Sequence, residues 1–173
     1  MRAETTPERL LLFMARLGRD VRTPGRVYLT GGATALLHGW RTATVDIDLV
    51  FEPESREIFE ALPRLKDELD VNVEIAAPSH FIPEVPGWRE RSLYIGAHGE
   101  LTFYHYDPYS QALAKVERDH ARDRTDVSEM VARGLVDPSR AVSLFHAIER
   151  ELVRYPAVEP AAFAARVKDA FGG

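Results

Sequence analysis

The chain has 173 residues, of which 45% are hydrophobic and 28% charged, and this composition is typical of a globular domain with a substantial core. It contains no cysteine, so disulfides, thiolate metal sites and cysteine nucleophiles are excluded. The formal net charge of −5 argues against broad non-specific DNA binding. Because no apolar run approaches the about 20 residues that span a bilayer and nothing indicates secretion, we expect a cytoplasmic protein without membrane contact.

The first hundred residues alternate between helical and strand patterns. Thr5, Thr6 and Pro7 form a helix start, while Pro63 predicts a kink or break inside the third helix. In chain order, the pattern predicts a helix over 6–19, a strand over 27–29, a helix over 33–38, a strand over 45–51, a helix from 53 to about 68, a strand over 71–75 and a hairpin over 93–104.

The pattern becomes helical from Asp107 onward. Helices are expected at about 108–120, 123–133, 138–154 and 159–171, because glycines and prolines separate four apolar-periodic segments. We therefore predict an α+β protein with an α/β core over 1–106 and a helical C-terminal subdomain over 107–173 that packs on the core.

Two short segments suggest chemistry. Gly31-Gly32 ends a strand and begins a helix, so phosphate oxygens could approach backbone amides there without meeting a Cβ. After thirteen intervening residues, Asp46 and Asp48 share one face of a strand whose other face is apolar. Such hard oxygen ligands suit Mg²⁺ that is shared with substrate phosphates. Each segment alone is weak evidence, since exposed strands often carry acids, but the combination predicts a phosphoryl-transfer site.

The same residues resemble the signature of the DNA polymerase β-like nucleotidyltransferase superfamily. The resemblance rests on Thr30-Gly31-Gly32-Ala33 followed by Val45-Asp46-Ile47-Asp48-Leu49. Arg41-Thr42-Ala43-Thr44 before the aspartates is similar to the bacterial AbiEii-type toxin nucleotidyltransferases and their uncharacterised relatives. Lys115 and the stretch from Arg122 to Val127 also resemble that group, in which a Lys on one helix precedes an acidic element on the next.

The resemblance implies a minimal nucleotidyltransferase fold, with a mixed sheet of about five strands flanked by helices and a helical C-terminal part. It implies Mg²⁺ or Mn²⁺ as cofactor and a nucleoside triphosphate, such as ATP, as substrate. The reaction would transfer a nucleotide to an acceptor hydroxyl on RNA, tRNA, a protein or a small molecule. A role as the toxin of a toxin–antitoxin pair would add a cognate antitoxin as partner.

The resemblance also assigns roles to residues. Asp46 and Asp48 would hold metal, and strand alternation puts Asn72 and Glu74 opposite the core face, which makes Glu74 the candidate third acid. Glu74 is equally compatible with a solvated edge residue. Asp126 is a catalytic candidate, whereas Asp123 near a helix start is better explained as a cap. The residues expected to contact the nucleotide are Thr30, Gly31, Gly32, Arg41, Thr44 and Lys115.

Three alternatives remain open at this level. A lysine such as Lys115 often pairs with an acid on a helix surface, and Arg41 also fits a surface loop charge. The same fold could serve as a non-catalytic nucleotide sensor, regulator or partner-binding module. The helical tail could contain a DNA-binding helix-turn-helix, which its modest basic content disfavours.

Overall fold

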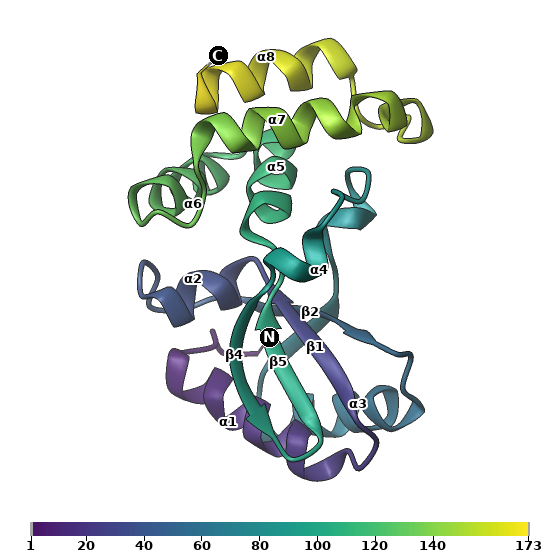
Figure 1. Ribbon diagram of the computed structural model, residues 1–173. Helices are drawn as coiled ribbons and strands as arrows, with labels where there is room; N and C mark the ends of the chain where they lie inside the picture. The colour runs from purple at the N-terminus through teal and green to yellow at the C-terminus, as the bar shows by residue number, and fades with distance from the viewer. Residues whose placement is uncertain (1, 173) are drawn as a thin grey trace. The chain divides into compact units, whose positions relative to one another are not determined.

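Five strands form one mixed sheet in the computed structural model, which describes residues 2–172 (Figure 1). The strands are β1 (Gly25–Thr30), β2 (Asp46–Glu52), β3 (Asn72–Ile75), β4 (Leu93–His98) and β5 (Leu101–His105). Their order across the sheet is β3-β2-β1-β5-β4. β1 pairs antiparallel with β2 and parallel with β5, β2 pairs parallel with β3, and β4 and β5 form an antiparallel hairpin.

The sheet belongs to the first of two compact units, which comprises the chain up to Ala77 together with Leu93–His105. Its helices are α1 (Pro7–Asp20), α2 (Gly32–His38) and α3 (Arg56–Leu69). The core lies between α1, α3 and one face of the sheet, and it includes Phe13, Leu49, Leu65 and Phe103, all without exposed surface. This arrangement leaves polar strand residues to the opposite face.

Local sequence explains where these helices begin. The Thr6 hydroxyl caps α1 by accepting a hydrogen bond from the Arg9 amide at 3.3 Å, and Ser55 caps α3 by accepting from the Ile58 amide at 3.2 Å. α3 includes Pro63 and continues to Leu69, so the break expected at Pro63 is absent. Proline removes one backbone hydrogen bond, but burial of the apolar stripe of α3 outweighs that loss.

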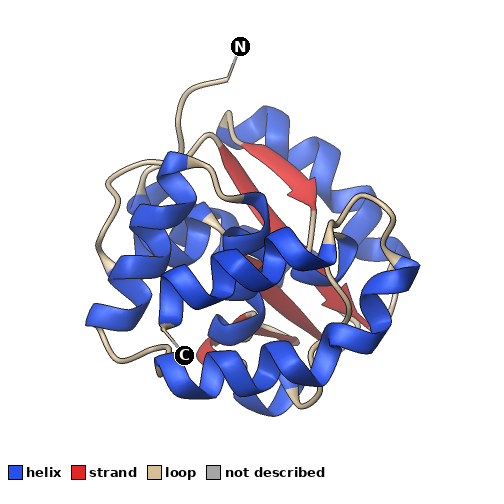
Figure 2. Ribbon diagram, turned by 90° about the horizontal axis from the view of Figure 1, so that it is seen from above, coloured by secondary structure: helices blue, strands red, loops and turns tan. Residues whose placement is uncertain are grey.

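The second unit comprises Pro78–Ser92 and the chain from Tyr106 onward, and it is helical. Figure 2 distinguishes the helices in blue from the strands of the sheet in red. The elements of this second unit are the 3₁₀ turn η1 (Pro78–His80), α4 (Trp88–Arg91), α5 (Pro108–Arg118), α6 (Ala121–Ala132), α7 (Pro138–Ile148), the 3₁₀ helix η2 (Glu149–Arg154) and α8 (Pro160–Phe171). The predicted α+β class, with a five-stranded mixed sheet and C-terminal helices, is confirmed.

A buried carboxylate joins the two chain segments of the second unit. Asp107 is fully buried, caps α5 by accepting from the amides of Tyr109 and Ser110, and forms two hydrogen bonds with the Arg91 guanidinium at 3.1 and 2.7 Å. Trp88 stacks on Tyr106 with ring centroids 4.3 Å apart and planes 3° from parallel. These contacts attach the segment Pro78–Ser92 to the helices that follow Tyr106.

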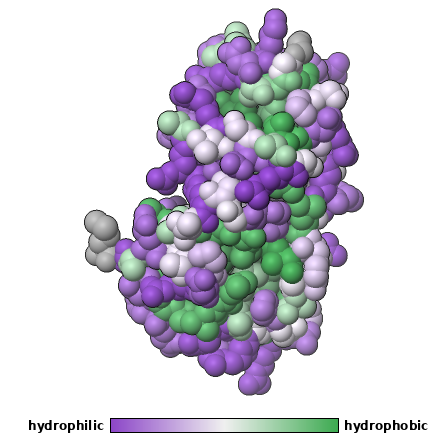
Figure 3. Space-filling view, turned by 90° about the vertical axis from the view of Figure 1, so that its left-hand side faces the viewer, coloured by the Kyte–Doolittle hydropathy of each residue, from purple (hydrophilic) through white to green (hydrophobic). Residues whose placement is uncertain are grey.

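Across residues 2–172, no helix combines the length and apolar character needed to cross a membrane. Hydrophilic residues predominate on the face drawn in Figure 3, where hydrophobic residues occur in separate groups. The exposed apolar side chains of the described chain include Leu11 and Leu12 on α1 and Tyr94 on β4.

His105, the last residue of β5, is buried against α2. Its Nδ1 lies 3.1 Å from the Thr34 hydroxyl, and its ring lies 4.5 Å from that of His38. Burial, helped by the neighbouring His38, lowers the pKa of His105 to about 3. The imidazole is therefore neutral in the folded protein at physiological pH, whereas in the unfolded chain it titrates near 6.5.

This burial predicts a pH-dependent loss of stability. Between pH 7 and pH 5 the unfolded chain takes up a proton at His105 and the folded chain does not, so stability falls as pH falls through 6.5. The contribution amounts to about 2 kcal/mol of unfolding free energy. Urea denaturation should show a flatter pH dependence for His105→Gln than for wild type or for His80→Gln, a change at an exposed histidine. Identical slopes for all three proteins would contradict the assignment.

The start of α2 depends on a close approach that only glycine permits. A Cβ at Gly32 would lie 2.0 Å from Oγ1 and 2.6 Å from Cβ of Thr44. We expect Gly32→Ala to lower the unfolding free energy by about 1–3 kcal/mol through overpacking. Gly96→Ala is the matched control, since nothing lies within 4 Å of a Cβ built there. Chemical denaturation that ranks the two variants equally would refute this account of Gly32.

Candidate active site

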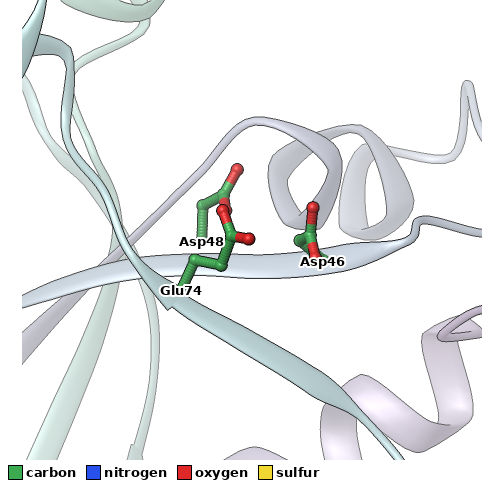
Figure 4. Close-up of side chains that lie close together, drawn as sticks. All are labelled: Asp46, Asp48 and Glu74. Carbon is green, nitrogen blue, oxygen red and sulfur yellow. The ribbon is translucent and has the colours of Figure 1, made fainter. Parts of the chain in front are cut away.

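Three carboxylates meet on the face of the sheet that α1 and α3 leave uncovered. On β2, Ile47 and Leu49 are fully buried in the core, so Asp46 and Asp48 project from the other face and are partly exposed. Glu74 on β3 lies directly opposite Asp48 in the parallel ladder. One oxygen of each carboxylate lies within 4.8 Å of the others, and Figure 4 shows all three side chains on the same side of the strands.

Neighbouring polar groups fix the position of Asp46. The Asn72 amide nitrogen donates a hydrogen bond to Asp46 Oδ1, and Asn72 is also the residue opposite Asp46 in the β2–β3 register. The Thr44 hydroxyl donates to the Asp46 carbonyl at 3.2 Å, and the backbone of Thr44 forms a two-bond bridge with Thr5. Asn72 was placed on this face by strand alternation, but its contact with Asp46 depends on register, which single-sequence patterns do not reveal.

The turn after β1 lies against the same carboxylates. Thr30 is opposite Asp48 in the antiparallel β1–β2 ladder, and it is followed by Gly31 with a φ of +64°. That conformation favours glycine, and a Cβ at Gly31 would lie 3.0 Å from Asp48 Oδ2. Gly31 and Gly32 thus bring backbone close to Asp48. Arg41 lies in the loop between α2 and β2 and is partly buried.

Lys115 and Asp126 belong to the second unit, where they form a buried ion pair. Lys115 Nζ on α5 donates to Asp126 Oδ2 on α6 at 2.8 Å and lies 3.7 Å from Asp123 Oδ1. Asp123 and Asp126 are each 1% exposed and Lys115 is 8% exposed. Arg118 forms two hydrogen bonds with Asp123, at 2.8 and 2.6 Å. Two cations and two carboxylates therefore balance each other between α5 and α6.

Asp123 also ends the first turn of α6. The helix begins at Ala121, two residues earlier than expected, so Asp123 lies inside its first turn and caps it by accepting a hydrogen bond from the amide of the N-cap residue His120 at 3.2 Å. Burial raises the pKa of the Asp123 carboxyl, but hydrogen bonds from Arg118 and the charge of Lys115 outweigh it and hold that pKa below its usual range. The carboxylate remains charged at neutral pH, and the contacts of Asp123 are those of a structural residue.

The sequence-predicted residues thus fall into two groups. In the sheet-bearing unit, the three acids share one face of β2 and β3, Thr30 and Gly31 lie beside Asp48 at the end of β1, and Gly32 lies close to Thr44. In the helical unit, Lys115 and Asp126 meet each other. The first group joins residues that are remote in sequence, and its three carboxylates could hold a metal ion.

Comparison with known proteins gives one match. No curated protein and no solved structure matches the chain. The family described as "Nucleotidyltransferase of unknown function (DUF6036)" matches residues 13–157, a span that includes every residue of both groups. Since this match covers most of the chain, the protein belongs to that family of nucleotidyltransferases.

Proposed function

We propose that the protein is a Mg²⁺- or Mn²⁺-dependent enzyme that transfers a nucleotide from a nucleoside triphosphate to an acceptor hydroxyl. One observation carries the proposal: Asp46, Asp48 and Glu74 converge from two adjacent strands beside a glycine turn. Membership in a nucleotidyltransferase family supports the same class of reaction. The acids alone would not suffice, because exposed acidic groups commonly cluster without binding metal.

The spacing of the acids suits metal binding. Oxygens that share one Mg²⁺ at about 2.1 Å are separated by at most about 4.2 Å. The oxygens here lie within 4.8 Å of one another, so small side-chain rotations would bring them onto one ion. Two ions about 4 Å apart, as in many phosphoryl-transfer sites, would also fit such a set. All three ligands are hard carboxylate oxygens, which Mg²⁺ and Mn²⁺ prefer.

We assign a role to each residue around the three carboxylates. Asp46 and Asp48 hold the cation, Asn72 orients Asp46, and Glu74 completes the ligand set or accepts the proton of the attacking hydroxyl. The bound cation would neutralise phosphate charge and lower the pKa of the acceptor hydroxyl. The backbone of Gly31 and Gly32 accommodates the phosphates. We assign Thr30, Arg41 and Thr44 to positioning the nucleotide and the loop around it.

Lys115 and Asp126 are proposed to contribute to nucleotide transfer from the helical unit. Their contacts favour a positioning role, since the Lys115 ammonium already pairs with two buried carboxylates and would have to leave them to bind phosphate. Direct contact of Lys115 with the triphosphate is the competing assignment. If Lys115 has a positioning role, its substitution lowers stability. If Lys115 contacts the triphosphate directly, its substitution lowers nucleotide affinity.

A transfer assay tests the central proposal. Labelled nucleoside triphosphates, offered one at a time with Mg²⁺ and either total RNA, protein extract or small metabolites, should label one acceptor class.

We expect Asp46→Asn, Asp48→Asn and Glu74→Gln to reduce transfer by at least about 100-fold. Glu54→Gln, a change at an exposed glutamate outside the carboxylate cluster, should leave transfer intact. Metal-dependent nucleotide binding without any transfer would instead identify a nucleotide sensor or regulator. A toxin would show RNA labelling and growth arrest that a cognate antitoxin relieves.

The repulsion between the acids gives a second prediction. At about 5 Å two carboxylates repel by roughly 1 kcal/mol in water, so Asp48→Asn should stabilise the metal-free protein by about that amount. The same change should abolish the stabilisation that saturating Mg²⁺ gives the wild type. Urea denaturation in EDTA and in Mg²⁺ measures both effects. If Mg²⁺ stabilises wild type and Asp48→Asn equally, the cation binds elsewhere.

The buried pair gives a third prediction. Lys115→Met should lower the unfolding free energy by about 3–5 kcal/mol, because it removes the ammonium that pairs with the buried Asp126 carboxylate. Adding Asp126→Leu should restore much of that loss, since the uncompensated charge is then removed as well. Arg133→Met, at an exposed salt bridge, is the matched control. A stable Lys115→Met protein with a raised KM for nucleotide would instead assign Lys115 to the phosphates.

A further inference from the structure

The polar face of the sheet carries its side chains in rows, because residues that lie opposite each other on neighbouring strands point to the same side. Thr30, Asp48 and Glu74 form one such row across β1, β2 and β3. The Gly31–Gly32 turn follows Thr30 directly and so lies on one side of this acidic row. The next row of the same face contains Tyr28, two residues back along β1 and about 7 Å away. It therefore lies on the side of the acids that is opposite to the glycine turn.

Three tyrosines form this second row on β1, β5 and β4, which lie side by side in Figure 1. Tyr28 is opposite Tyr104 in the parallel β1–β5 ladder, and Tyr104 is opposite Tyr94 in the β4–β5 hairpin. The rings of Tyr28 and Tyr104 stack with centroids 5.4 Å apart, and Tyr94 meets Tyr104 in a T-shaped arrangement at 6.1 Å. The three rings form one aromatic surface, which we call the tyrosine row.

The tyrosine row is open to solvent at its β4 end. Tyr28 is 1% exposed, Tyr104 is partly exposed and Tyr94 is 65% exposed. Packing within the protein explains the position of Tyr28, but it leaves most of the Tyr94 ring in water. A tyrosine ring exposed in this way is suited to a planar ligand, because stacking removes apolar surface of both partners from water.

The charges around the tyrosine row suit a neutral ring better than an anion. Glu52 lies opposite Arg26 in the next row of the β1–β2 ladder, and the three acids lie on the other side of the tyrosines. These carboxylates would repel an anionic group, whereas a nucleobase is uncharged and presents only hydrogen-bonding edges. The Arg26 guanidinium, 5.8 Å from the centroid of the Tyr104 ring, has donors for such an edge.

A nucleotide bound at the acids would extend to the tyrosine row. With its terminal phosphates at the glycine turn and its α-phosphate on a cation at Asp48, its nucleoside continues away from the turn. Six bonds join the α-phosphorus to the glycosidic nitrogen, a reach of about 7 Å in an extended chain, and the base extends beyond that nitrogen. The Cα atoms of Asp48 and Tyr104 are separated by two strands and two residues, or about 12 Å. The base therefore arrives over the tyrosine row.

We propose that the base of the nucleoside triphosphate stacks on Tyr104 and Tyr94, so that the tyrosine row is the base-binding part of the site. This inference rests on the proposed function, because it requires phosphates at the glycine turn and a cation at the acids. Tyr104 and Tyr94 contact the base, whereas Tyr28 supports Tyr104 by stacking on its ring. Every base has an aromatic face, so the row provides affinity for nucleotides over phosphates that lack a base.

Binding of nucleotides and of a probe without a base tests the proposal. The full chain in Mg²⁺ is titrated calorimetrically with ATP, GTP, CTP and UTP, and with inorganic tripolyphosphate. Wild type should bind the preferred nucleotide at least about fivefold more tightly than tripolyphosphate, because only the nucleotide can stack.

Variants locate the base. Tyr94→Ala and Tyr104→Ala should each weaken binding of the preferred nucleotide by at least about fivefold and leave tripolyphosphate binding unchanged, which also verifies that the variants are folded. Tyr94→Phe should keep the affinity of wild type, because it retains the ring. Phe59→Ala, at a 49% exposed aromatic residue of α3 on the other side of the sheet, is the matched control.

The outcomes separate this inference from the proposed function. If wild type binds nucleotides and tripolyphosphate equally, or if both alanine variants keep wild-type affinity for nucleotide, the stacking is refuted and the metal site is not. Equal weakening of nucleotide and tripolyphosphate in the alanine variants would also refute it, since that result assigns the tyrosines to structure. If wild type binds neither ligand in Mg²⁺, the proposed function itself fails, and the base-binding role fails with it.

Discussion

The crowding of negative charge on one face of the sheet, where β2 and β3 run side by side, is the constraint on which the site depends. Asp46, Asp48 and Glu74 come within 4.8 Å of one another because strand alternation and the β2–β3 register leave them no other arrangement. Their repulsion is tolerated because the apolar face of the same strands is buried in the core. The buried core thus supplies stability that offsets the repulsion within the carboxylate cluster.

Neighbouring residues hold the carboxylate cluster in position. Asn72 orients Asp46, the Thr44 hydroxyl holds the backbone carbonyl of Asp46, and Gly32 allows Thr44 to come close. Substitution of any of these groups would move a carboxylate without removing it. In the helical unit, the ion pair of Lys115 and Asp126 also depends on more than one group, because its contribution to stability requires both charges.

Most strand and helix positions were predictable from the sequence, because apolar periodicity and capping residues such as Thr6 and Ser55 act locally. The helix expected over 138–154 is an exception, since α7 ends at Ile148 and the chain continues as the 3₁₀ helix η2. The shared face of Asp46 and Asp48 follows from the same rule. The pairing of Lys115 with an acid was one of the alternatives that the sequence left open, whereas the contact of Asn72 with Asp46 was not predictable, since strand register joins residues far apart in the chain. Continuation of α3 through Pro63 also depended on tertiary burial. The association of Trp88 with Tyr106 likewise has no local signal.

Crystals grown with Mn²⁺ and a non-hydrolysable nucleoside triphosphate test the central claim most directly. Anomalous scattering from these crystals locates the metal. The account predicts an anomalous peak about 2.1 Å from oxygens of Asp46 and Asp48, with the phosphates beside Gly31 and Gly32. The peak should disappear in Asp48→Asn crystals. Bound nucleotide without metal at these carboxylates, or metal held elsewhere in the wild type, would contradict the account.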